Sequence, residues 1–157
     1  MFKLYYMSMC APSRAAKIIL NEKGIKFHSI NEPVWQRRIE LNITEHLYNA
    51  FRYSVGIDIF KERMTVIPEA VEGLSTIVQT KLKWLDAQME DKDYITGKDM
   101  KLVDIILYCA LDFGAGVNQT IPTELNNINA WFEKMHNRES AKSTYHADSE
   151  KTKMRGI

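Results

Sequence analysis

Cysteine is rare in this sequence, which has 157 residues and only two cysteines, Cys10 and Cys109. They lie far apart, so we expect no disulfide framework and a reducing location, the cytoplasm. Charge of one sign is also lacking, because 21 basic and 20 acidic side chains leave a formal net charge of +1. A protein that binds nucleic acid through bulk charge needs a basic face, so this balance argues against a nucleic-acid partner.

Metal-ligand spacings, nucleotide-binding loops and long apolar runs are missing as well. The four histidines form no metal-ligand spacing with one another or with the cysteines, so no metal site is predicted. The sequence has no Walker loop and no GxGxxG turn. Its apolar runs are too short for a bilayer, and the apolar start of the chain is too short for a signal peptide, so no membrane partner is expected.

The pattern at the start of the chain predicts a strand, a helix and a second strand. Residues 3–7 and 25–30 show the alternation of short strands. The helix is expected over residues 13–23, with Pro12 at its first position and Gly24 just past its end. A strand, helix and strand this closely spaced imply parallel pairing of the two strands through a right-handed crossover.

The rest of the sequence is helical in pattern, and the start of the first long helix is open. Asn31 could cap it, with Pro33 in its first turn. Alternatively, Asn42 and Glu45 could form a capping box. Apolar residues then recur every fourth position and carry the helix to about residue 64, at Leu47, Phe51, Val55 and Ile59.

Three further helices follow. One runs from about residue 68 to 89 with an apolar stripe at Val71, Leu74, Val78, Leu82 and Leu85. Residues 102–113 are apolar on nearly every side, which is typical of a helix in the middle of a bundle. The last runs from about residue 122 to 138 with a break near Asn126. The predicted fold class is therefore α+β, mostly α.

Three motifs in order along the chain resemble those of the glutathione S-transferases. Cys10-Ala11-Pro12-Ser13-Arg14 resembles the family's first turn and helix. Tyr94-Ile95-Thr96-Gly97 with Asp104 is similar to the entry into the central helix, and Trp131 to Ala141 is similar to the last long helix. The resemblance implies a partial thioredoxin-like, glutathione-binding domain over residues 1–38 and an all-helical C-terminal domain over residues 39–157.

The sequence also departs from that family. Between the second strand and the helical domain the family has a helix, a turn with a cis proline and two more strands, but here Trp35 passes almost directly into the helices. The missing part normally pairs with the cysteine of glutathione and grips its γ-glutamyl group. Lys101 also stands where the family's capping box has Ser or Thr, and Glu139 stands where a proline is usual.

Cys10 and Tyr6 are the two candidates for the catalytic residue that reacts with glutathione or stabilises its thiolate. Cys10 lies just before the predicted helix, in a Cys-x-x-Ser arrangement with Ser13, where the helix dipole would lower the pKa of the thiol. The resemblance gives Cys10 the place of the catalytic serine or cysteine. It gives Tyr6, at the end of the first strand, the place of the hydroxyl that donates to the glutathione sulfur. Both residues have an ordinary structural reading as well.

Trp35 and Arg38 are the candidates for holding glutathione, because the resemblance implies that this loop binds the glycine carboxylate. They could equally form a solvated first turn of the long helix. Asp104 is expected to be structural, accepting backbone N–H groups near the start of its helix. Cys109, in an apolar segment, is expected to be an inert core residue.

Three hypotheses about function remain. The first is a detoxifying enzyme that conjugates or exchanges glutathione, as its co-substrate, with small hydrophobic electrophiles or disulfides. The second is a non-catalytic module that has lost half of the glutathione site and binds another protein through its helices. The third is a deletion form. We expect a homodimer, and an open two-stranded sheet favours exchange of strands between the copies.

Overall fold

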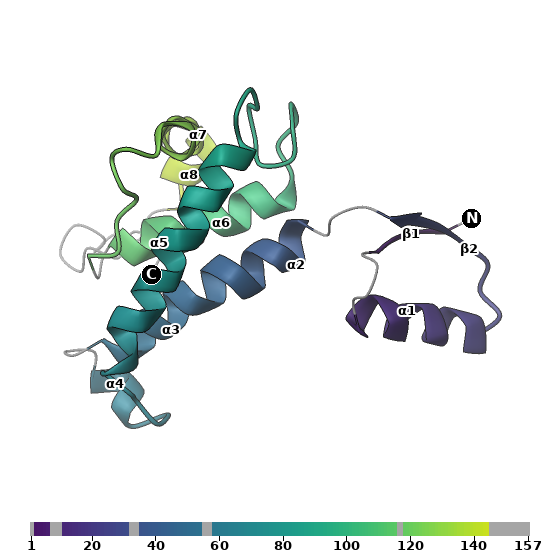
Figure 1. Cartoon of the computed structure of the whole chain (residues 1–157), viewed down its shortest axis with the longest axis horizontal. Helices are drawn as coiled ribbons and strands as arrows, with labels where there is room; N and C mark the ends of the chain where they lie inside the picture. The colour runs from purple at the N-terminus through teal and green to yellow at the C-terminus, as the bar shows by residue number, and fades with distance from the viewer. Residues whose placement is uncertain (1, 7–10, 32–34, 55–57, 116–117, 145–157) are drawn as a thin grey trace. The chain divides into compact units, whose positions relative to one another are not determined.

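The computed structural model describes residues 2–6, 11–31, 35–54, 58–115 and 118–144, and all of their side chains except those of residues 5–6, 11–13, 30–31 and 58–59. The chain divides into two compact units, Met1–Arg38 and Ile39–Ile157. A two-stranded sheet comes first and a helical bundle follows, so the fold is α+β and mostly α, as the sequence predicts (Figure 1).

The N-terminal unit contains a strand, a helix and a second strand: β1 (Phe2–Tyr6), α1 (Ala11–Glu22) and β2 (Phe27–Asn31). The two strands pair in parallel, from Phe2 opposite Phe27 to Tyr6 opposite Asn31. The predicted order and pairing are therefore confirmed. Both strand predictions are displaced by one or two residues, and α1 begins at Ala11, one residue before Pro12.

Gly24 ends α1 as the sequence predicts. Its φ of +62° is a left-handed conformation that costs glycine little. The backbone N–H of Ile25 donates to the carbonyl of Leu20, and that of Gly24 donates to the carbonyl of Asn21, each at 2.9 Å. These two bonds are those of a Schellman motif, which satisfies the last carbonyls of the helix and turns the chain toward β2.

The first long helix begins at Trp35, not at Asn42. It consists of α2 (Trp35–Ile39), a π-helical turn η1 (Glu40–Thr44) and α3 (Glu45–Tyr53). Asn42 lies inside this continuous helix, so the predicted capping box is wrong. Asn31 is the last residue of β2 rather than a cap, and Pro33 lies outside the described residues.

The same helix ends sooner than predicted. Ser54 adopts an extended backbone with ψ of 138°, and its hydroxyl donates to the carbonyl of Ala50 at 2.7 Å. A short helix α4 (Asp58–Lys61) follows. The prediction of one helix to about residue 64 is therefore wrong, and Val55, part of its apolar pattern, lies outside the described residues.

Three longer helices and one short one complete the second unit: α5 (Ala70–Gln88), α6 (Leu102–Ala115), α7 (Asn126–His136) and α8 (Glu139–Lys142). Figure 1 shows α5 crossing the bundle, in contact with α3 and α7, while α6 also contacts both. The core is apolar and draws on every one of the longer helices: Ile39, Ile43, Leu47, Phe51, Val78, Leu82, Leu85, Val103, Leu107, Leu111, Ile128, Trp131 and Met135.

One face of α6 is exposed, which corrects two predictions. Leu102 is 57% exposed and Ile105 is 42% exposed, although the helix was expected to be buried on every side. Cys109 is also exposed, so it is not a core residue. These three positions lie three and four residues apart, and therefore share one side of the helix. The opposite side supplies Val103, Leu107 and Leu111 to the core.

Candidate functional site

The sequence-predicted site residues all belong to the N-terminal unit. Tyr6 is the last residue of β1, and Ser13 is the third residue of α1. Cys10 lies outside the described residues, as do the side chains of Tyr6 and Ser13. Along the sequence, Cys10 lies between the carboxyl end of β1 and the first turn of α1. In the sheet, Tyr6 lies opposite Asn31.

The amino end of α1 is electropositive. The first N–H groups of any helix lack partners within it, and the helix dipole adds partial positive charge there. The first turn of α1 has no acidic residue to offset this, and Arg14 is exposed beside it. An anion such as a thiolate is stabilised in such a place.

Trp35 and Arg38 lie together on α2. They are three residues apart on the helix, so their side chains leave on the same side. Trp35 is half-buried and Arg38 is exposed. A guanidinium such as that of Arg38 can donate two parallel hydrogen bonds to a carboxylate.

Asp104 is the polar centre of the helical unit. Its side chain is completely buried. Oδ1 accepts hydrogen bonds from the backbone N–H of Ile95 and from Nε1 of Trp131, both at 2.9 Å. Oδ2 accepts the backbone N–H of Lys101 at 2.9 Å. Asp104 is thus structural, as predicted: it joins the turn before α6, the start of α6 and α7.

Asp86 plays a similar part at the start of α7, and the sequence pattern does not predict this role. Its Oδ1 accepts the backbone N–H of Ile128 at 2.9 Å, and its backbone carbonyl accepts Nδ2 of Asn127 at 3.0 Å. The carboxylate therefore caps a helix that lies about forty residues further along the chain. The one sign of this role in the sequence is that Asp86, a polar residue, follows Leu85 of the apolar stripe.

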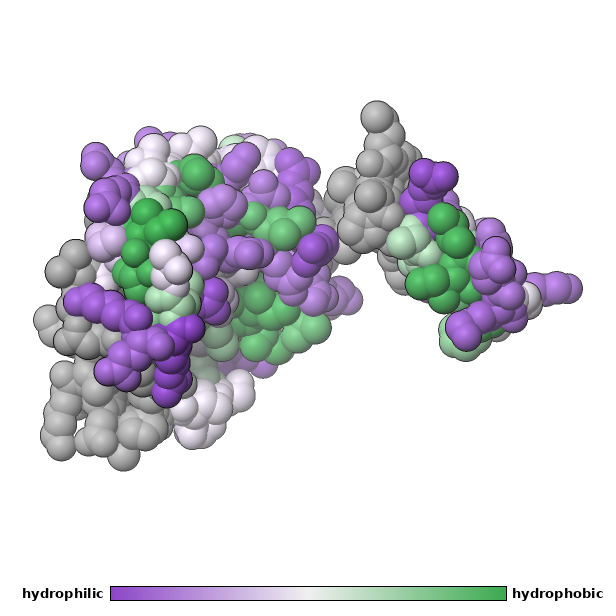
Figure 2. All heavy atoms as spheres, turned by 90° about the horizontal axis from the view of Figure 1, so that it is seen from below, coloured by the Kyte–Doolittle hydropathy of each residue, from purple (hydrophilic) through white to green (hydrophobic). Residues whose placement is uncertain are grey.

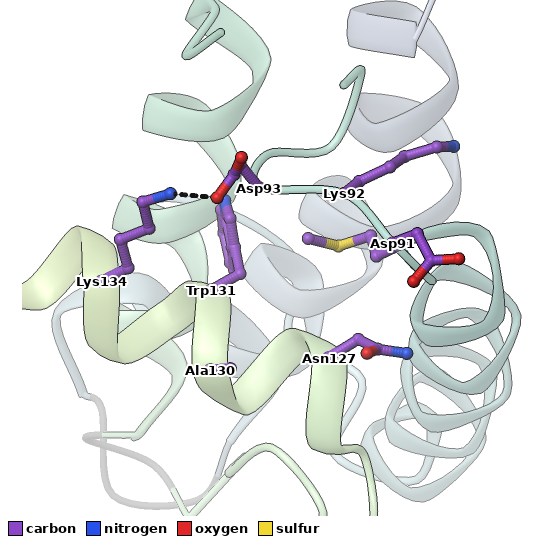
Figure 3. Close-up of a pocket in the computed structure, with 8 residues that line it drawn as sticks. Asp91, Lys92, Asp93, Asn127, Ala130, Trp131 and Lys134 are labelled. Carbon is purple, nitrogen blue, oxygen red and sulfur yellow. Dashed lines mark hydrogen bonds and ion pairs between the residues drawn. The ribbon is translucent and has the colours of Figure 1, made fainter. Parts of the chain in front are cut away.

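A pocket of about 360 Å³ lies between the turn after α5 and one side of α7 (Figure 3). Its floor includes Trp131, and Asp91 and Asn127 lie on one side of it. On the other side, Nζ of Lys134 and Oδ1 of Asp93 form an ion pair at 2.8 Å. The hydrogen bond from Lys134 lowers the pKa of Asp93, and the same bond raises the pKa of Lys134.

A second pocket, of about 630 Å³, lies in the N-terminal unit, at the end of α1 and the start of β2. Its lining includes Asn21, Lys26 and Ser29. Neither pocket includes a residue that the sequence predicts for the site. No sequence pattern predicts either pocket.

Cys109 on α6 and Tyr48 on α3 are weak acids that interact electrostatically. Partial burial of the thiol raises the pKa of Cys109, and the carboxylate of Asp112 raises it further. Burial also raises the pKa of Tyr48, with a smaller contribution from Cys109 and an opposing one from Arg52. A raised pKa leaves the thiol of Cys109 protonated at neutral pH, which makes it a poor nucleophile.

In the part of the chain that the structure describes, no three His, Cys, Asp or Glu side chains gather as a metal site would require. None of the described helices combines the length and the apolar character needed to span a bilayer.

The helical unit matches the family model of the glutathione S-transferase C-terminal domain over residues 49–139. No curated protein matches the sequence. Among solved structures, a glutathione S-transferase domain-containing protein of Marinobacter aquaeolei VT8 is 14% identical, with a TM-score of 0.61 over 89% of this chain and 100% of that one.

Two other solved structures are similar in fold. Gtt2 of Saccharomyces cerevisiae is 19% identical, with a TM-score of 0.62 over 85% of this chain and 68% of that one. BphK, a bacterial glutathione S-transferase whose solved structure is a ternary complex, is 17% identical, with a TM-score of 0.53 over 90% of this chain and 96% of that one. Because the family model matches more than half of the sequence, the chain belongs to the glutathione S-transferase family.

Proposed function

We propose that this protein binds glutathione in its N-terminal unit and transfers it to small hydrophobic electrophiles or disulfides in the cytoplasm, as a detoxifying enzyme. The observation that carries the proposal is the parallel β1–α1–β2 arrangement, in which the sequence around Cys10 joins the carboxyl end of β1 to the electropositive start of α1. That end of the helix stabilises a thiolate, which is the reactive form of either a cysteine or glutathione.

In conjugation, the thiolate sulfur of glutathione forms a bond to the electrophilic carbon, and the bond to the leaving group breaks. The thiol proton passes to solvent before attack. At neutral pH a free thiol is mostly protonated, so the enzyme's main task is to favour the thiolate. Tyr6 would do so by donating a hydrogen bond to the sulfur, with Ser13 as a second donor from the first turn of α1.

In exchange, Cys10 would itself be the nucleophile. Its thiolate attacks a disulfide that contains glutathione, forms a mixed disulfide with the glutathione sulfur and releases the other thiol. A second glutathione thiolate then attacks this mixed disulfide, which gives glutathione disulfide and restores Cys10. In both reactions Arg38, beside Trp35, would bind the glycine carboxylate.

One observation favours a second function, a non-catalytic module. The described sheet has two strands, and three residues separate β2 from α2, which leaves no room for further strands there. A two-stranded sheet is marginal on its own. In the enzyme, a homodimer that exchanges strands between copies would supply the missing pairing.

The test is calorimetric titration of the full chain with reduced glutathione, repeated with Cys10→Ser, Tyr6→Phe and Arg38→Gln variants. The titration distinguishes the enzyme from the non-catalytic module, because only the enzyme is expected to bind glutathione. The rates of conjugation and of disulfide exchange are measured on the same variants. Loss of exchange in Cys10→Ser, with conjugation retained, assigns exchange to Cys10. Loss of conjugation in Tyr6→Phe assigns the thiolate to Tyr6, and weaker binding in Arg38→Gln assigns the carboxylate contact.

A further inference from the structure

Exposed apolar side chains occur in both units of the chain, and Figure 2 shows hydrophobic surface on each of them. Such surface alone does not specify a ligand. A small-molecule site is a concavity of about 300–1,000 Å³ in which a few polar groups converge at fixed positions. The pocket of about 360 Å³ beside α7 has this character and belongs entirely to the helical unit (Figure 3). Its volume suits a ligand of few atoms.

Hydrogen bonds to Asp104 and Asp86 hold two walls of this pocket in place. The indole of Trp131, in the floor, donates to the buried carboxylate of Asp104 at 2.9 Å. Nδ2 of Asn127 donates to the backbone carbonyl of Asp86 at 3.0 Å. Side chains that are already held in this way lose little conformational entropy when a ligand binds. The pocket is therefore pre-organised before any ligand enters it.

The open polar groups of the pocket are hydrogen-bond acceptors. Among the described residues, the carboxylate of Asp91 has no hydrogen-bond or ion-pair partner. Asn127 uses only its Nδ2 and Asp93 only its Oδ1, so Oδ1 of Asn127 and Oδ2 of Asp93 accept nothing from the described part of the chain. Figure 3 shows Asp91 and Asn127 reaching the same side of the pocket from two elements, the turn after α5 and the helix α7.

The cations that line the pocket are already engaged. Nζ of Lys134 pairs with Oδ1 of Asp93 at 2.8 Å. Nζ of Lys92 donates to the backbone carbonyl of Gln88 at 2.6 Å, and Figure 3 shows its side chain directed away from the pocket floor. Asp91 therefore leaves one negative charge without an opposite partner at the pocket.

We infer that this pocket binds a short-chain aliphatic primary amine in its charged form. An ammonium group carries three donors, which matches the three open acceptors, and its charge is opposite to that of Asp91. Such amines resemble the lysine side chain, whose pKa of about 10.4 keeps it charged at neutral pH. The methylene groups of the ligand lie against the apolar part of the lining, at Met89, Ala130 and Trp131. The inference goes beyond the proposed function and requires no glutathione.

The test is titration of the ¹⁵N-labelled full chain with n-butylamine hydrochloride in phosphate buffer at pH 7, followed by NMR. We expect saturable shifts of the amide signals of Asp91 and Asn127 with a Kd of about 1–10 mM, because a small ligand with one solvent-exposed ionic contact binds weakly. 1-Butanol, which has the chain but no charge, should give no saturable shift. Tetramethylammonium, which has the charge but no donor, should bind at least about threefold more weakly.

Two variants should move the affinity in opposite directions. Asp91→Asn removes the free charge, and the backbone φ of +58° at this position is one that asparagine also adopts, so Kd should rise about fivefold in a folded protein. Lys134→Gln releases Asp93 from its ion pair and adds a second free charge, so Kd should fall about two- to fivefold. Glu90→Gln, the matched control, makes the same change in charge as Asp91→Asn at an exposed residue outside the lining, and should alter Kd by less than about twofold.

Each outcome bears on the inference. The absence of saturable shifts at 100 mM n-butylamine overturns it, and so does equal binding of 1-butanol or tetramethylammonium. Equal weakening in Asp91→Asn and Glu90→Gln overturns the assignment to this pocket. Circular dichroism checks that each variant is folded, and if Asp91→Asn is not, tighter or unchanged binding in Lys134→Gln decides. Glutathione binding is measured separately, so the failure of either proposal is recognised by itself.

Discussion

Nε1 of Trp131 on α7 donates a hydrogen bond of 2.9 Å to Oδ1 of Asp104 on α6, and neither side chain is more than 2% exposed. The same carboxylate accepts the backbone N–H groups of Ile95 and Lys101. One buried acid thus holds together a turn and two helices. Lys101, where the family's capping box has Ser or Thr, still supplies the backbone donor of that box.

Replacing Asp104 should destabilise the protein severely. Asp104→Ala removes the acceptor of three buried donors, and we expect the free energy of unfolding to fall by about 3–5 kcal/mol. The measurement is urea denaturation followed by circular dichroism. Asp99→Ala, at an exposed acid nearby, is the matched control and should change it by less than about 0.5 kcal/mol. Similar losses of unfolding free energy in both variants would contradict this structural role of Asp104.

Asp86 should matter less than Asp104 but clearly more than its neighbours. Asp86→Ala removes the acceptor for the backbone N–H of Ile128 at the start of α7, and we expect a loss of about 1–2 kcal/mol in the free energy of unfolding. Glu90→Ala, at an exposed acid after the same helix, serves as control. Hydrogen exchange should also show faster opening of the first turn of α7 in Asp86→Ala, and unchanged exchange there would contradict the capping role.

The ion pair between Asp93 and Lys134 should appear in the titration of Asp93. The hydrogen bond from Lys134 lowers the pKa of Asp93 below its ordinary value. A lowered pKa means that this bond stabilises the fold above the unfolded pKa of about 3.9 and that the stabilisation is lost as pH falls through the lower folded pKa. For Lys134, whose pKa is raised, the stabilisation is present below its ordinary pKa and lost as pH rises through the raised value.

Carboxyl NMR shifts measured against pH check this prediction. Lys134→Gln should return the pKa of Asp93 toward its ordinary value, and high salt should do so in part, since the pair is exposed. An unchanged titration of Asp93 in Lys134→Gln would contradict it.

The two cysteines should differ in reactivity. Partial burial of the thiol and the nearby carboxylate of Asp112 raise the pKa of Cys109. Its thiol should therefore alkylate slowly at pH 7, although part of the residue is exposed. If Cys10 belongs to the electropositive start of α1, it should react with iodoacetamide about tenfold faster or more, because only thiolates react. Peptide mass spectrometry against time gives both rates. Faster alkylation of Cys109 than of Cys10 would contradict the role proposed for Cys10.

Short-range sequence patterns predicted those features of the fold that depend on residues close together in the sequence. Gly24 ends α1 and Pro12 lies in its first turn, because the backbone preferences of both residues act within a few residues. The stripe on α5 was predicted well in its second half, where Val78, Leu82 and Leu85 are buried. Val71 and Leu74 are only half-buried.

Features that depend on distant parts of the chain were not predictable. Asp86 caps a helix about forty residues later, and no local pattern announces that contact. Hydrophobicity alone placed the whole of α6 in the core, but packing of α3 and α7 on one side leaves Leu102, Ile105 and Cys109 exposed on the other. The π-helical turn at residues 40–44 keeps the helix continuous past Asn42, which a capping rule cannot foresee. For the site, the sequence indicated Cys10 through its place before a predicted helix. The resemblance to the family indicated Tyr6, Ser13, Trp35 and Arg38.

Titration of the full chain with reduced glutathione in a calorimeter tests the central claim most directly. The account predicts saturable binding with a Kd between micromolar and low millimolar, weakened by added salt because the N-terminal unit is basic, with seven basic and two acidic side chains in residues 1–38. A chain that is folded by circular dichroism and gives no binding heat at two temperatures would contradict it.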